Sequence, residues 1–257
     1  MLIEVNGKGG RVCAEAKSGK LRCPLMVRPT SEDVVTSRIF SSLKCINPRW
    51  WLPGFLSAAL GDGRFRPQIF RKLAINLWVR QKGVPKGLVP WNEGQTEVDV
   101  VVSWENPPTT VFVEMKYLSP LSKSTVDSPK QSKYPTDQLI RNVRIGLWRC
   151  GWYFEQKLFR EQPREFYTVL FSPKNGNELV QRYRSPENVR AAIPNSNRLI
   201  GLPDQPFVGE VSFRQLCKVL NANLENMTCS ERSNVTLLVD YLELKLSQKG
   251  SAGDTSN

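Results

Sequence analysis

The segment TEVDVVVSWENPPTTVFVEMKYL, residues 96–118, decides the fold. Apolar residues alternate with other residues over 96–104 and again over 111–118, which is the period of two that is typical of a strand. The intervening ENPPTT, residues 105–110, is rich in turn-forming residues. Two strands so close in sequence most simply form an antiparallel hairpin, so we expect a sheet at the centre of the molecule.

Helical and strand periods also occur on both sides of this hairpin. Before it, we expect a helix over residues 30–43, with Thr30 as its N-cap, and a second helix over Arg66–Gln81. After it, the sequence predicts a helix over Asp137–Arg149, a strand over 165–173, a helix that starts after Ser185, a strand over 207–213, and helices near 214–225 and 230–247. This order predicts the α/β class, with a mixed sheet flanked by helices.

The length of 257 residues fits one large domain, or a core with a modest appendage. We expect an N-terminal extension over residues 1–29 and a core over residues 30–175. A C-terminal strand and helices, residues 176–247, are expected to pack on this core, followed by a flexible tail over residues 248–257. Within the core, the polar segment 119–135 is predicted to be a mobile loop.

The charge of the chain favours a polyanionic partner. It has 36 basic and 24 acidic residues, a net charge of +12 and an isoelectric point near 9.6. Because basic side chains displace counterions from phosphates, we expect nucleic acid rather than a membrane as the partner. Without an apolar leader or a run of about 20 apolar residues, we expect a soluble, cytoplasmic protein. Its six cysteines are then expected to be free, buried thiols.

The sequence contains no histidine. This absence excludes Ser-His-Asp and Cys-His catalysis, zinc sites ligated by histidine, and ribonucleases that depend on histidine. Any hydrolytic chemistry in this chain must therefore use carboxylates, lysine and a hard metal ion.

Charged side chains share a face on the two central strands. Alternation puts Asp99 on one face of the first strand, and Glu114 and Lys116 together on one face of the second. Neighbouring strands lie about 5 Å apart, so these three side chains are expected to converge. Two carboxylates suffice for Mg²⁺, and a lysine can orient or help deprotonate an attacking water. The alternative is a structural ion pair of Lys116 with Asp99 or Glu114.

Side chains of the flanking helices can reach the same place. The apolar stripe of the first helix consists of Val35, Ile39 and Leu43. At about 100° per residue, Glu32 lies on that stripe. An acid in such a position is either salt-bridged or part of a site. From the later helix, Gln138 and Arg141 can face the site as well.

Along the chain, the order is Glu32 in an early helix, then the strands TEVDVVV and VFVEMKY, then DQLIRN in the next helix. The order of these elements resembles the PD-(D/E)xK, restriction-endonuclease-like nuclease superfamily, stand-alone bacterial type. The resemblance covers about residues 30–175. It implies an α-β-β-β-α-β core with additional C-terminal helices. It also implies Mg²⁺ or Mn²⁺ held by Asp99 and Glu114, Lys116 as the catalytic lysine, Glu32 as a further metal or water ligand, and Gln138 as a residue that shapes the site.

The sequence departs from the family pattern in one place, because no proline precedes Asp99. Glu97 could share the metal or lie just behind it. The resemblance implies a metal-dependent endonuclease on DNA in bacterial phage defence or restriction, acting as a homodimer or with partner proteins. Three alternatives stay open: a catalytically inactive nucleic-acid-binding module of the same fold, an RNA-cleaving effector, and a basic scaffold whose carboxylates are only ion-paired.

Overall fold

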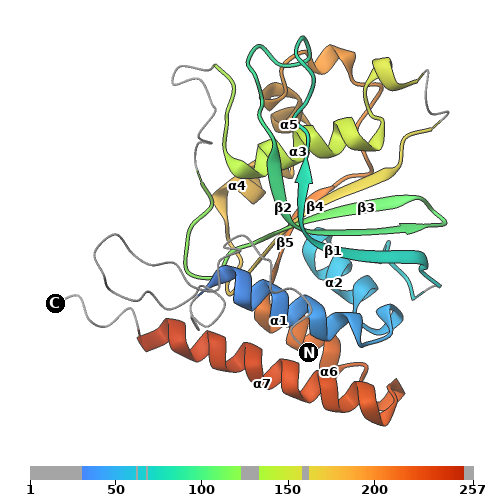
Figure 1. Ribbon diagram of the computed structural model, residues 1–257, viewed down its shortest axis with the longest axis vertical. Helices are drawn as coiled ribbons and strands as arrows, with labels where there is room; N and C mark the ends of the chain where they lie inside the picture. Colours follow the sequence, from blue (N-terminus) through green and yellow to red (C-terminus); the bar gives the residue numbers. More distant parts are fainter. Residues whose placement is uncertain (1–30, 62, 68, 123–132, 158–161, 252–257) are drawn as a thin grey trace, which may run out of the picture.

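A computed structural model describes residues 31–61, 63–67, 69–122, 133–157 and 162–251 (Figure 1). Several predictions made from the sequence lie outside these residues. They are the N-terminal extension, the capping role of Thr30, most of the 119–135 loop and the end of the C-terminal tail. The N-cap of the first helix is Ser31, whose side chain makes no capping hydrogen bond.

A five-stranded mixed sheet forms the centre of the molecule, with the strands in the order β1-β2-β3-β4-β5. The strands are β1 (Arg71–Gln81), β2 (Thr96–Glu105), β3 (Thr109–Met115), β4 (Glu165–Ser172) and β5 (Val208–Ser212). The pairs β1–β2 and β2–β3 are antiparallel, so the predicted hairpin is confirmed. The pairs β3–β4 and β4–β5 are parallel, with helices in each connection.

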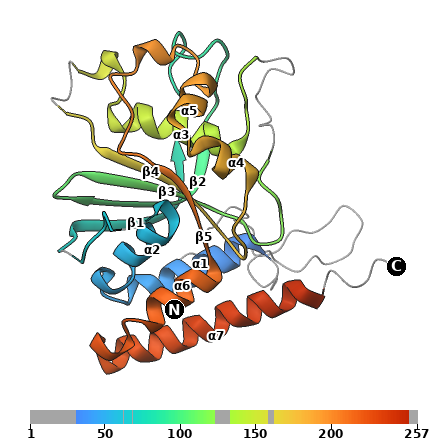
Figure 2. The same cartoon turned by 180° about the vertical axis from the view of Figure 1, so that it is seen from behind.

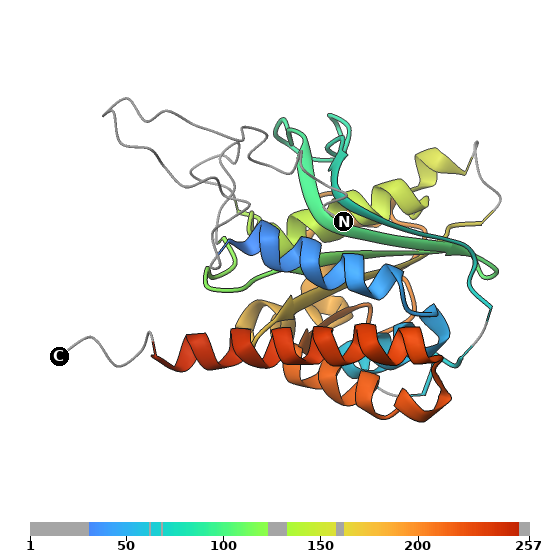
Figure 3. The same ribbon diagram turned by 60° about the horizontal axis from the view of Figure 1, so that its bottom comes forward.

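Helices cover both faces of this sheet (Figures 1 and 2). One face carries α3 (Gln138–Cys150), α4 (Glu178–Tyr183) and α5 (Pro186–Ala192). The other carries α1 (Glu32–Lys44), α2 (Leu52–Leu60), α6 (Phe213–Asn221) and α7 (Cys229–Ser251), the last of which runs along α1 and α6 (Figure 3). Short 3-10 helices occur at Pro48–Trp50, Phe154–Gln156, Ser196–Arg198 and Leu224–Asn226. The chain therefore has an α/β fold with a mixed sheet flanked by helices.

The predicted helix over Arg66–Gln81 is wrong, because most of this segment is strand β1. Its apolar residues satisfy two periods at once. Ile69, Leu73 and Leu77 recur at helical spacing, but Leu73, Ile75, Leu77 and Val79 alternate as in a strand. Pairing with β2 along Ala74–Gln81 decides between the two periods, because the backbone finds its hydrogen-bond partners there. A helix over this segment would have placed Ile69 on its buried side with Leu73 and Leu77, but Ile69 is 90% exposed.

Helix α2 was not predicted, whereas the helices near residues 30–43, 137–149, 186–193, 214–225 and 230–247 are confirmed with small shifts at their ends. The expectation of buried thiols holds for Cys150 and Cys217, but Cys45 and Cys229 are exposed. No helix within the described part of the chain is long and apolar enough to span a membrane.

Aromatic side chains fill the space between the sheet and each helical layer. On the α1 side, Phe171 of β4 packs edge-on against Phe40, Phe55 and Phe213. On the α3 side, the ring of Phe166 packs edge-on against Phe112 and lies under Gly146 of α3. Any side chain at Gly146 would meet the Phe166 ring, so the glycine allows α3 to approach the sheet closely.

This close approach can be tested with Gly146→Ala. An added Cβ would lie 1.9 Å from the Phe166 ring. Because α3 must then move, or Phe166 must leave its rotamer, we expect a loss of about 1–3 kcal/mol in the free energy of unfolding, measured by urea denaturation. The control is Gly201→Ala, whose Cβ would meet Trp152 at an ordinary 3.5 Å and should leave stability nearly unchanged. Equal stability of both variants would contradict the proposed constraint.

Candidate active site

The candidate site lies where β2 and β3 part. The last paired residues of the two strands at this end are Val100 and Val113. One residue further along β2, the Met115 N–H of β3 donates its hydrogen bond to a side chain instead of to a backbone carbonyl. Its acceptor is Asp99 Oδ2, at 2.9 Å. Beyond this point β3 continues beside β4, with the Lys116 N–H donating to the carbonyl of Phe171. Asp99 is therefore at the point of separation, and the residue is buried, with 5% of its surface exposed.

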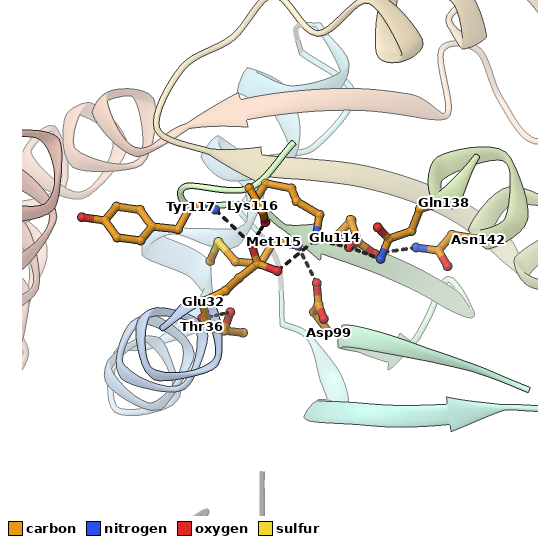
Figure 4. A network of polar contacts seen from close by, with 10 residues as sticks. Glu32, Thr36, Asp99, Glu114, Met115, Lys116, Tyr117, Gln138 and Asn142 are labelled. Carbon is orange, nitrogen blue, oxygen red and sulfur yellow. Dashed lines mark hydrogen bonds and ion pairs between the residues drawn. The ribbon is translucent and has the colours of Figure 1, made fainter. Parts of the chain in front are cut away.

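Glu114 is the centre of the polar network drawn in Figure 4, and it is fully buried. Its Oε1 accepts a hydrogen bond from Gln138 Nε2 at 2.5 Å and lies 2.9 Å from Lys116 Nζ. Its Oε2 accepts a hydrogen bond from Asn142 Nδ2 at 2.9 Å. These donors satisfy both oxygens of the buried carboxylate, whose burial without hydrogen-bond partners would cost free energy of folding.

Helix α3 presents two of these donors because its start is fixed. Asp137 is the N-cap, and its Oδ1 accepts a hydrogen bond from the Ile140 N–H at 3.0 Å. Its other oxygen accepts a hydrogen bond from the hydroxyl of Tyr183 in α4 at 2.6 Å. Gln138 and Asn142 are four residues apart, so they lie on one face of the helix. Asn142 was not predicted as a site residue, although this spacing from Gln138 was a signal for it.

Glu32 and Lys116 are in direct contact, which joins α1 to the site. Glu32 Oε1 lies 2.9 Å from Lys116 Nζ. Glu32 Oε2 accepts hydrogen bonds from the Tyr117 N–H at 3.2 Å and from Ser119 Oγ at 2.9 Å. Lys116 thus bridges Glu32 and Glu114, with its side chain only 13% exposed. Glu32 lies on the apolar stripe of α1 because it is the partner of Lys116 and of the two residues Tyr117 and Ser119 that follow it.

The carboxylates shift the pKa values of the site. Burial raises the pKa of Asp99 well above its usual value, and the neighbouring charge of Glu114 raises it further. The two carboxyl groups are therefore neighbours whose negative charges oppose each other. Burial alone would lower the pKa of Lys116, but the carboxylates of Glu114 and Glu32 more than reverse this effect, and its pKa lies above the usual value.

Two further residues that the sequence predicted near the site, Glu97 and Arg141, lie at its edge and contact other parts of the chain. Glu97 is two residues before Asp99 in β2 and pairs with Arg80 of β1, with Arg80 Nε 3.8 Å from Glu97 Oε2. Arg141 points to the connection between β1 and β2, where its guanidinium donates hydrogen bonds to the carbonyls of Gly94 and Gln95, both at 3.0 Å. The structure thus brings together Asp99, Glu114, Lys116, Glu32 and Gln138, and it directs Arg141 to a structural contact.

The donor set at this site suits a hard cation. Mg²⁺ prefers oxygen ligands and often takes only one or two carboxylates from the protein. Asp99 and Glu114 offer two adjacent buried carboxylates, whose mutual repulsion a cation would relieve. The amide oxygen of Asn142 is also buried and has no hydrogen-bond partner among the described residues. Within those residues, no group of three or more His, Cys, Asp or Glu side chains is arranged to hold a metal ion.

Comparisons with known proteins do not assign the chain. No family model matches it, and neither a curated protein nor a solved structure is significantly similar to it. The resemblance to PD-(D/E)xK nucleases therefore stays a prediction that rests on the residues and their arrangement.

Replacing Asp99 by Asn tests the electrostatic conflict between the carboxylates. Because the pKa of Asp99 is raised in the folded protein, Asp99 contributes its full stabilisation below the ordinary pKa of Asp, and this contribution is lost as pH rises through the raised pKa. The amide oxygen of Asn can still accept the Met115 N–H without a charge. In metal-free buffer we expect Asp99→Asn to raise the Tm at neutral pH, with a smaller gain at pH 4.

The measurement is thermal unfolding at several pH values, with Asp240→Asn as a control. Asp240 is an exposed residue of α7, so its replacement should leave the Tm and its pH dependence unchanged. A lower Tm for Asp99→Asn at neutral pH would contradict the proposed repulsion.

Proposed function

We propose that this chain is a metal-dependent nuclease that hydrolyses phosphodiester bonds, with DNA as the preferred substrate. The observation that carries this proposal is the ion pair of Glu114 with Lys116 at the separation of β2 and β3, where the buried Asp99 accepts the Met115 N–H between these two residues. This combination supplies metal ligands and a fixed cation without any histidine, as the composition of the chain requires. The net charge of +12 supports a polyanionic substrate.

The order of elements is consistent with the proposal. From α1 through β1, β2, β3 and α3 to β4, the chain follows the α-β-β-β-α-β order of the PD-(D/E)xK core, with α2 as an addition. The helices also contribute as that resemblance implies, since Glu32 of α1 and Gln138 of α3 both contact the central residues. These features support a nuclease of this type, in which bacterial defence is the setting that we propose.

Each side chain has a defined task in this proposal. Asp99 and Glu114 would hold Mg²⁺ or Mn²⁺, which supplies charge to polarise a phosphodiester and to lower the pKa of a bound water. Lys116 is a protonated donor in the arrangement described, so it can orient the attacking water and offset the charge that develops on the phosphate. Glu32 and Gln138 keep Lys116 and Glu114 in place.

One observation favours a second candidate, a catalytically inactive nucleic-acid-binding module. Both oxygens of Glu114 accept hydrogen bonds from side chains of α3, and Oε1 also contacts Lys116. A network of this kind can serve folding alone, because it satisfies a buried carboxylate. The two candidates differ in whether metal leads to cleavage.

The decisive experiment incubates the protein with plasmid DNA and with total RNA, with and without Mg²⁺ and Mn²⁺. We expect metal-dependent cleavage, with DNA cut faster than RNA. Lys116→Ala should lower the rate by about 100-fold or more, since it removes a fixed cation near the developing charge. Lys218→Ala, which removes an exposed cation of α6, is the matched control and should cleave like the wild type.

Each outcome separates the candidates. Binding of nucleic acid without cleavage in either metal would support the inactive module. Preferential cleavage of RNA would identify an RNA-cleaving effector. A scaffold protein would show neither cleavage nor stabilisation by metal, because a ligand that binds the folded state must raise the Tm.

Glu32→Gln distinguishes a partner of Lys116 from a metal ligand. Glutamine keeps an oxygen for the Tyr117 N–H but loses the charge that holds Lys116. We expect cleavage to fall about 10-fold or more, comparable with the loss of one positioning interaction, while the Mg²⁺-induced rise in Tm is unchanged. Loss of that Tm rise would instead assign Glu32 as a metal ligand.

A further inference from the structure

Strand β1 extends the row of site residues by one strand. The pairs Leu77–Val100 and Val79–Val98 place Trp78 opposite Asp99. In the other direction, Asp99 follows the last β2–β3 pair, Val100–Val113, and so lies level with Glu114. Trp78, Asp99 and Glu114 therefore occupy one row across three neighbouring strands. Residues opposite each other on paired strands have their Cβ atoms about 5 Å apart, so Trp78 is adjacent to Asp99.

Trp78 is held in an unusual conformation at this position. Its φ is 50°, in the left-handed region, although it is a bulky residue inside a strand. Its indole N–H is hidden from solvent and has no hydrogen-bond partner among the described residues. Both features cost stability, and such costs cluster at functional sites. The ring is half-buried, so part of its surface stays accessible.

The same strand carries an exposed positive charge near this ring. Alternation places Arg80 two residues from Trp78, on the same side of β1. Its side chain is 79% exposed, and Arg80 Nε lies 3.8 Å from Glu97 Oε2, a long distance for an ion pair. The β1–β2 ribbon bends away from the other strands of the sheet (Figure 1).

We infer that Trp78 and Arg80 bind the nucleic-acid strand next to the bond that is cut, with the indole stacked on an unpaired base and the guanidinium on a neighbouring phosphate. This inference rests on the proposed function, and it specifies the substrate as single-stranded or locally unpaired. An aromatic ring stacks on any base, but only where the base has left a duplex. An exposed arginine beside the ring suits the phosphate that accompanies the base.

The test measures binding of fluorescently labelled single-stranded and duplex oligonucleotides by anisotropy. It uses Lys116→Ala protein with Mg²⁺, so that binding is followed without cleavage. In this background, Trp78→Ala should weaken single-strand binding by about 5- to 100-fold, the range expected for loss of one stacked base, and weaken duplex binding less. Trp78→Phe should retain most of the affinity. Trp50→Ala, which removes a half-buried indole of the opposite helical layer, should bind as before.

Arg80→Ala provides a second test that does not depend on the folding of the Trp78 variants. Because Arg80 is exposed, its loss should leave the Tm unchanged. The slope of log affinity against log salt should fall by about one, as expected for one lost phosphate contact. Arg214→Ala, an exposed arginine of α6, is the matched control and should keep the slope.

Unchanged affinity and salt dependence in both Trp78→Ala and Arg80→Ala would overturn the inference, as would an equal loss for single strands and duplex. These outcomes can be separated from failure of the proposed function. If the wild type cuts neither DNA nor RNA but the binding differences appear, the nuclease proposal fails and the binding surface stands. If the wild type cuts and the variants bind normally, only the binding surface fails.

Discussion

The burial of the Glu114 carboxylate is the constraint on which the rest of the structure depends. A carboxylate without solvent is tolerated only when donors surround it, and here Lys116, directly after β3, and two side chains of α3 supply them together. The chain must therefore place α3 against the sheet to within the length of a hydrogen bond. The Asp137 cap, held by Tyr183, and the contact of Gly146 with Phe166 both serve this placement.

Helix α3 also determines where the β1–β2 ribbon goes. Gln138 and Asn142 of α3 donate to Glu114. Arg141 and Arg144 of the same helix contact the segment that connects β1 to β2. Arg144 forms a buried ion pair with Glu93, and its guanidinium lies over the ring of Trp91. The ribbon is thus held away from β3 at the level of Asp99, where the Asp99 carboxylate, instead of a backbone carbonyl of β2, accepts the Met115 N–H. Stability of the helix and geometry of the site are two results of the same packing.

The arrangement at the separated strands conflicts with stability in the absence of a cation. Two neighbouring buried carboxylates repel each other, and burial disfavours the charge on Asp99. The left-handed backbone of Trp78 adds a local cost one strand away. Proteins retain such features where function requires them. Lys116, charged and in contact with Glu114 and Glu32, offsets part of the repulsion and connects α1 to the same centre.

The sequence by itself determined what depends on local periodicity. Alternation in residues 96–118 predicted the hairpin and the shared face of Glu114 and Lys116, and helical spacing predicted α1 and α3 with Glu32 and Gln138 directed inward. Only the tertiary structure decided what depends on distant partners. Arg66–Gln81 contains both periods, and pairing with β2 makes it a strand. Arg141 is directed to the carbonyls of residues 94 and 95, and Asn142 to Glu114, because hydrogen-bond partners brought close by packing, rather than spacing along the helix, determine where a polar side chain points.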